Sequence, residues 1–193
     1  VVPEAITLVQ DGVVQRLLMS RVPRSDVSGS TGHGRSLGNA RREAMPAVIT
    51  VRPKRSRSSA ALRRKALAMA RTAGLSYVLV VRRLIPPGMS DDFQIAFTGE
   101  GPLPGLTAPI EAYRLYPDGR EQVVRNVGFV GVDRRVLRDI VAAGRLGAAV
   151  DVMDSPGRTG RFSIGAVGGL PVTWTVPSVL IDELELRGQG GGE

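Results

Sequence analysis

The chain has 193 residues and a formal net charge of +8, and 42% of its residues are hydrophobic but only 4% aromatic, which predicts one globular domain with an aliphatic core. Cysteine is absent and histidine occurs once, so disulfides, thiolate metal sites and two-histidine metal sites within this chain are excluded. No run of about 18 apolar residues occurs, which excludes a membrane-spanning helix.

The first predicted element is a hairpin over residues 5–20, which turns at Asp11-Gly12. Asp-Gly suits the two positive-φ positions of a type I′ turn, and its flanks are rich in Val, Ile and Leu. Residues 25–45 are polar, glycine-rich and charged, and predict a long loop of the kind that is usually functional or disordered. A strand over residues 47–53 follows and ends at its proline.

The clearest helix is predicted in the stretch SSAALRRKALAMARTAGL. Ser58 or Ser59 is the candidate N-cap, and Gly74 is the candidate residue just past the C-cap. Apolar side chains recur at helical spacing on one face, namely at Leu62, Ala66, Met69, Ala70 and Ala73. A buried strand over residues 76–84 is expected next.

The second half of the chain predicts further strands and one more helix. After a turn at residues 85–92 come a strand over 93–99 and a hairpin that turns at Pro117-Asp118-Gly119. Asp133 is expected to cap a short helix over 134–143, with Gly144 behind it, and strands follow over 148–153 and 171–188. About nine short strands, mostly in consecutive hairpins, and two packed helices predict an α+β, predominantly antiparallel β fold.

The stretch SGSTGHGRSLGN, residues 28–39, contains the single histidine and is the first candidate site. Its spaced glycines resemble a phosphate loop, but it lacks the Gly-Lys-Ser/Thr ending and no strong helix follows, so nucleotide binding is disfavoured. Its glycines could let backbone approach a substrate, with donors from His33 and Arg35. A polar turn without a function is an equally good interpretation.

Serines in and around this loop also suggest a hydrolase. Ser25, Ser28, Ser30 and Ser36 are candidate nucleophiles, with His33 as base and Asp26 as its orienting carboxylate. Neighbours in a flexible loop rarely hold a triad geometry, so a serine hydrolase is disfavoured.

The second candidate site is the basic stretch of residues 52–71, where no acidic residue occurs between Glu43 and Asp91. It could contact nucleic-acid phosphates, although no aromatic residue interleaves it for base stacking. A solvated helix face is the alternative, and so is codon bias, because only Lys54 and Lys65 of the 26 basic residues are lysines. The nucleic-acid candidates are Arg52, Lys54, Arg55, Arg57, Arg63 and Arg64.

The order of segments resembles the C-terminal domain of the TldD/PmbA family, which comprises bacterial and archaeal metallopeptidases and their non-catalytic relatives. The resemblance covers nearly the whole chain. It rests on AITLVQDGVVQRLLMSR, STGHGR, ALRRKALAMARTAGLSYVLVV, FQIAFTGEG, YRLYPDGREQVVRNVGFVG, LRDIVAAG and TVPSVLIDELELRG, which follow one another in the family's order.

The resemblance implies a single β-rich domain over residues 1–187, a flexible tail over 188–193 and an N-terminal domain outside this chain. In the family, a zinc-binding HExxxH helix lies upstream and a further metal ligand comes from the C-terminal part. This chain has no HExxxH, no cysteine and no histidine near residues 155–163, so the metal site is not carried over. Zinc would belong to the full-length protein or to a partner subunit.

The resemblance also implies a role and a setting. The domain would form one wall of a chamber that holds peptides by strand addition, within a homo- or hetero-oligomer, in the cytoplasm and without a membrane. It would not be catalytic alone. The residues expected near the substrate are Gly32, His33, Gly34 and Arg35.

Overall fold

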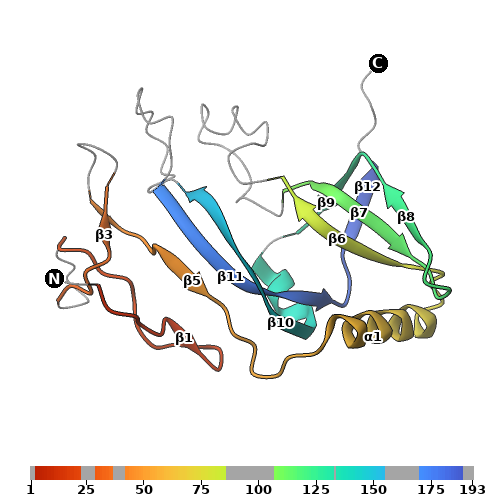
Figure 1. Ribbon diagram of the computed structural model, residues 1–193, viewed down its shortest axis with the longest axis horizontal. Helices are drawn as coiled ribbons and strands as arrows, with labels where there is room; N and C mark the ends of the chain where they lie inside the picture. The colour runs from red at the N-terminus through yellow and green to blue at the C-terminus, as the bar shows by residue number, and fades with distance from the viewer. Residues whose placement is uncertain are drawn as a thin grey trace, which may run out of the picture.

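The computed structural model describes residues 3–22, 29–36, 42–85, 107–132, 134–154 and 170–188. These residues form twelve strands, one α-helix and one 3₁₀ helix. The strands make small two- and three-stranded sheets, and every pair but one among the described residues is antiparallel. The α+β character and the antiparallel strands agree with prediction, whereas the predicted count of about nine strands is too low. Figure 1 shows an elongated molecule with the N-terminal strands at one end and the helix at the other.

The N-terminal hairpin forms where it is predicted. Strands β1 (Val9–Gln10) and β2 (Val13–Val14) are antiparallel and are joined by Asp11 at φ +50° and Gly12 at φ +80°. Both central residues therefore have the positive φ that a type I′ turn needs.

The predicted long loop contains a small ribbon. Strand β3 (Gly34–Arg35) is antiparallel to β4 (Glu43–Ala44), and Met45 N–H donates to the His33 carbonyl at 3.0 Å. The strand predicted over 47–53 is present as β5 (Val48–Thr50) and is shorter than expected. Part of the predicted loop is therefore an antiparallel ribbon of two short strands.

Helix α1 (Ser59–Thr72) begins and ends as the sequence predicts. The Ser58 hydroxyl caps it by accepting a hydrogen bond from Ala61 N–H at 3.2 Å. Gly74 lies just beyond its end at φ +72°. On the predicted apolar face Ala70 is buried, while Ala73 is exposed.

A three-stranded sheet lies beside α1 (Figure 1), formed by β6 (Val78–Leu84), β7 (Pro109–Leu115) and β8 (Glu121–Val124). The predicted turn joins β7 to β8, with Gly119 at φ +85° and the Asp118 carboxylate accepting from Arg120 N–H at 2.9 Å. Strand β6 is predicted to be buried, but each of its residues is half-buried or exposed. Strand β9 (Val127–Val130) then leaves this sheet to pair with β12 (Glu185–Gly188).

The second predicted helix, over residues 134–143, is wrong. Residues Arg134–Asp139 form a 3₁₀ helix, η1, and strand β10 (Ile140–Asp154) starts directly after it. Strand β10 pairs antiparallel with β11 (Leu170–Ile181), and this long ladder outweighs the short apolar pattern that had suggested a helix. The strand predicted over 148–153 is the second half of β10, and the closing strands are β11 and β12.

Gly144, predicted to end that helix, instead allows close packing inside β10. A Cβ at this position would lie 3.1 Å from Leu62 Cδ1 of α1 and 3.4 Å from the Ser178 carbonyl oxygen. The missing side chain therefore lets the helix approach the β10–β11 ribbon.

Several predicted features lie outside the described residues. They are the strand over 93–99, the Asp133 cap and the tail over 189–193, together with Ser25, Asp26 and Ser28 of the disfavoured hydrolase.

The aliphatic core is much smaller than the composition suggests. The buried hydrophobic side chains of the described residues are Met19, Met45, Ala70, Ala112, Leu115 and Val172. Large hydrophobic side chains stay exposed along β10 and β11, such as Val150 at 55% and Val179 at 46%. The chain therefore presents apolar sheet surface that its own described residues do not cover.

Candidate functional site

The described part of the Gly-rich loop, residues 29–36, is held against Met19 by hydrogen bonds from Thr31 and His33. The Met19 N–H donates to Thr31 Oγ1 at 2.8 Å, and the Thr31 hydroxyl and backbone N–H approach the Met19 carbonyl at 3.1 and 3.3 Å. His33 N–H donates to the same carbonyl at 3.2 Å. Met19 is buried, so the loop is anchored at an ordered point.

Two glycines shape the loop in different ways. Gly32 has φ +77°, a conformation that L side chains rarely adopt. Gly34 approaches the preceding segment, because a Cβ there would lie 3.1 Å from Ser20 Cβ. The observed close approach is to the chain's own Ser20, whereas the glycine spacing had suggested approach of the backbone to a substrate, which stays a prediction.

His33 is half-buried, and its ring Nδ1 lies 2.9 Å from Thr31 Oγ1. No serine hydroxyl or carboxylate of the described residues bonds to this ring. The Ser30 hydroxyl is instead used locally, where it accepts from Gly32 N–H at 3.2 Å. The contacts of His33 in the described chain are those of a residue that stabilises the loop.

Arg35 also binds protein groups. Its Nη1 donates to the Pro46 carbonyl at 2.8 Å and to the Pro171 carbonyl at 2.9 Å. The second bond joins the loop to the start of β11, which is 136 residues away in the chain. The sequence suggests that Arg35 donates a hydrogen bond to a substrate, but its Nη1 donates to two backbone carbonyls of the chain instead.

Two of the four predicted substrate residues line one cavity, which has a volume of about 250 Å³. Gly32 and Gly34 line it, whereas His33 and Arg35 are not among its described lining residues. The other lining residues are Arg21, Ser30 and Arg42. Sequence reasoning missed both arginines, because only strand pairing and the Thr31–Met19 contacts bring them together.

The six candidates of the basic stretch are not equivalent. Lys54 pairs with Asp11 at 3.3 Å in an exposed contact, and Arg63 of α1 pairs with Glu121 of β8 at 2.9 Å. Among the described residues, no ion pair engages the others, which are the exposed side chains of Arg52, Arg55, Arg57 and Arg64.

A second polar cluster lies on the β6–β7–β8 sheet. Arg82 Nη2 donates to Glu121 Oε2 at 2.6 Å, and the Arg82 guanidinium lies 4.4 Å from the Tyr113 ring centre. The Tyr113 hydroxyl donates to Glu111 Oε1 at 2.9 Å, and this hydrogen bond is the main cause that raises the pKa of Tyr113. Desolvation is the largest single effect on the pKa of Arg82 and lowers it. The charge and hydrogen bond of Glu121, together with Tyr113 and Glu111, outweigh this effect and leave that pKa raised.

Every charge in this second cluster has a partner. Arg82 lies between Glu121 and Glu111, and Arg63 also contacts Glu121. A closed set of alternating charges joins helix to sheet and leaves no charge to bind a ligand, so we interpret it as structural.

A metal centre does not fit the described residues. No group of three or more His, Cys, Asp or Glu side chains in this part of the chain lies close enough to hold a metal ion. In the same part, no helix has both the length and the apolar character needed to cross a bilayer.

Comparisons of the chain with protein-family models, curated proteins and solved structures found no match. The candidate site is therefore defined by its geometry, and the family resemblance stays a prediction.

Proposed function

We infer that this chain is the C-terminal domain of a TldD/PmbA-like, metallopeptidase-related protein and forms one wall of a peptide-binding chamber in an oligomer. It contributes binding surface and no catalytic group of its own. Zinc, where the assembly uses it, is held by an N-terminal domain or a partner subunit, since the described residues offer no ligand set. A cytoplasmic location is part of this proposal.

The observation that carries the proposal is the uncovered sheet formed by β10, β11 and β5. Trp174 of β11 is in register with Val150 of β10 and Ile49 of β5, so the three side chains share one face. Val150 is 55% exposed, and Val176, two residues from Trp174 on the same face, is 39% exposed. A partly uncovered apolar sheet face supports packing against another domain or subunit.

The same sheet offers an open edge for a peptide. The order of strands is β10-β11-β5, so β10 is an edge strand, and beyond its bridge from Gly144 to Arg57 no described residue pairs with its outer side. Extended peptides bind such edges through backbone hydrogen bonds, which grip many sequences alike.

The ladder defines which residues face that edge. Thr173 N–H donates to Ala47 and the Thr175 carbonyl accepts from Val51, so the backbone groups of these two residues point toward β5. The backbone N–H and carbonyl of Trp174, between them, therefore point toward β10, where Trp174 pairs with Val150. The backbone N–H groups of Ala149 and Asp151, on either side of Val150, then point to the open side.

This edge gives a specific test with a matched control. Ala149→Pro removes an outward N–H without removing a β10–β11 bond, whereas Ala149→Val keeps it. Peptide cleavage by the full-length protein, assembled with its catalytic subunit, should lose about 2- to 10-fold in kcat/KM with proline and little with valine. Equal activity of both variants would exclude strand addition at β10.

The metal part of the proposal is tested separately by elemental analysis of the full-length protein, alone and in the assembly. About one zinc per catalytic subunit is the amount expected of a single-zinc peptidase site. An assembly with neither zinc nor peptidase activity would contradict the proposed function.

The alternative is a nucleic-acid-binding domain that uses the basic stretch of residues 52–71. Arg52, Arg55 and Arg64 are exposed and form no ion pair with another described residue, and this observation keeps the alternative testable. An electrophoretic mobility shift whose strength falls steeply with salt would favour this alternative, and no shift at moderate salt would remove it.

A further inference from the structure

We propose that the cavity between Arg21 and Arg42 binds the oxyanion group of a ligand, either a phosphate or a carboxylate. This inference goes beyond the proposed function and needs neither a peptidase nor an oligomer.

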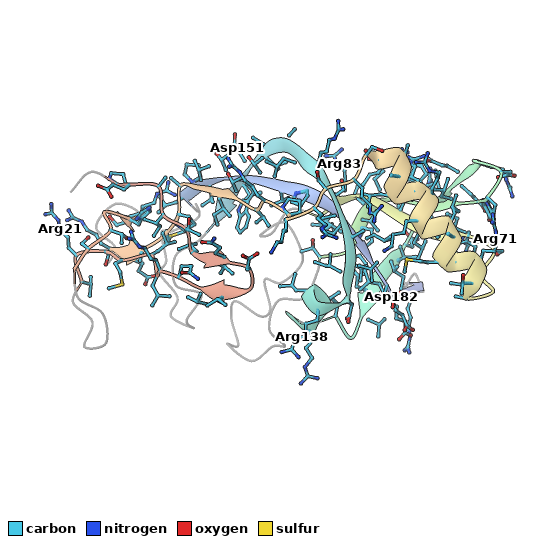
Figure 2. All side chains as sticks on the ribbon, turned by 90° about the horizontal axis from the view of Figure 1, so that it is seen from below. Arg21, Arg71, Arg83, Arg138, Asp151 and Asp182 are labelled. Carbon is cyan, nitrogen blue, oxygen red and sulfur yellow. The ribbon has the colours of Figure 1, made fainter. Side chains whose placement is uncertain are left out.

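Two contacts create the cavity from distant parts of the chain. The Thr31–Met19 hydrogen bonds hold residues 30–34 against the segment that continues into Arg21. The pairing of Arg35 with Glu43 holds the residue before Glu43, Arg42, at the same place. Figure 2 shows Arg21 at the end of the molecule remote from Arg71 of α1.

The cavity has positive charge and no described counter-ion. Both arginines are exposed, and neither forms an ion pair or side-chain hydrogen bond with another described residue. None of its described lining residues is acidic. Two guanidinium groups that line one cavity repel each other, and a bound anion would turn that repulsion into attraction.

The chemistry of the lining selects an oxyanion over a halide. A guanidinium presents paired N–H donors that match the oxygens of a carboxylate or phosphate. Ser30 Oγ accepts from Gly32 N–H, which leaves its own O–H to donate into the cavity. Gly32 and Gly34 add no side chain that would fill the space.

The size of the cavity is compatible with this ligand class. Its volume of about 250 Å³ equals the share of roughly eight water molecules in the liquid. It has room for a phosphate or carboxylate together with part of the molecule that carries it.

The test is isothermal titration of the 193-residue chain with inorganic phosphate, with acetate and with a short peptide in free-acid and C-terminally amidated forms. Sodium chloride keeps the ionic strength constant. We expect saturable binding of phosphate or of the free carboxylates, and none of the amidated peptide. Phosphate alone would identify a phosphate ligand, and the free-acid peptide or acetate would identify a carboxylate.

The variant R21Q/R42Q should weaken this binding by at least about tenfold, because it removes two charge-assisted contacts. The control R125Q/R138Q removes the same charge from two exposed arginines outside the cavity lining and should bind as the parent chain does. Figure 2 shows Arg138 well apart from Arg21.

Thermal unfolding of each variant shows whether it is folded, and R21K/R42K, which keeps the charge but loses the fork of donors, provides a second measurement. Weaker binding by the folded lysine variant supports recognition of the oxyanion by guanidinium geometry. The proposal is overturned if no oxyanion binds saturably, or if R21Q/R42Q and R125Q/R138Q weaken binding equally.

Discussion

Arg35 donates from Nη1 to the backbone carbonyl of Pro171, at 2.9 Å, across 136 residues of chain. The same nitrogen donates to the Pro46 carbonyl at 2.8 Å, so one side chain joins the Gly-rich loop, the approach to β5 and the start of β11. The loop predicted to bind substrate is therefore joined to the sheet of β10, β11 and β5.

Arg35→Gln should lower the free energy of unfolding by about 1–2 kcal/mol, because two hydrogen bonds from a charged donor are lost at a partly exposed site. Urea denaturation followed by circular dichroism measures this change. Arg21→Gln is the matched control, since it removes the same charge from a side chain with no described partner. An equal loss in both variants would mean that charge, and not these two bonds, sets the effect.

Ser58→Ala should destabilise the chain by about 0.5–2 kcal/mol, because Ser58 Oγ satisfies the Ala61 N–H at the start of α1. Ser59→Ala, at the first helical residue, is the control and should change stability by a few tenths of a kcal/mol or less. The comparison is made by thermal unfolding of the two variants under identical conditions. A larger loss in the Ser59 variant would show that the cap is misassigned.

Gly147→Ala should cost about 1–3 kcal/mol of stability, because the new Cβ would lie 3.0 Å from the Val176 carbonyl oxygen and the ladder must move. Gly144→Ala should cost less, because its closest neighbour at 3.1 Å is Leu62 Cδ1, at the mobile end of a side chain. Chemical denaturation of both variants gives the order. The reverse order would contradict the packing of β10 against β11 and α1.

The Tyr113 phenol should titrate at a higher pH than an ordinary tyrosine, since its hydrogen bond to Glu111 raises its pKa. A pKa that is higher in the folded than in the unfolded state stabilises the fold below the unfolded pKa. That contribution is lost as pH rises through the folded pKa. Absorbance titration of tyrosinate measures this shift, with Tyr113→Phe assigning the signal.

Glu111→Gln should lower the Tyr113 midpoint, because the amide oxygen keeps an acceptor but removes the negative charge. An unchanged Tyr113 midpoint in the Glu111 variant would refute this assignment.

Elements whose signals lie within a few consecutive residues follow from the sequence alone. Helix α1 has its cap at Ser58 and its terminating glycine at Gly74, and the turns at Asp11-Gly12 and Asp118-Gly119 provide the positive φ that hairpins need. Absent residue types are equally local information, because a chain without cysteine has no thiolate to offer. These predictions depend on backbone conformation and chemistry that each residue carries with it.

How residues 134–154 fold, and which charged side chains lie near one another, depends on the tertiary structure. The apolar pattern near Ile140 suits a helical turn and a strand alike, and pairing with β11, which is distant in sequence, selects the strand. The placement of Arg21 and Arg42 around one cavity, and the hydrogen bond from Arg35 to the Pro171 carbonyl, likewise depend on contacts between separate segments. Such contacts gain their free energy from partners that no local window contains, so a sequence pattern cannot specify them.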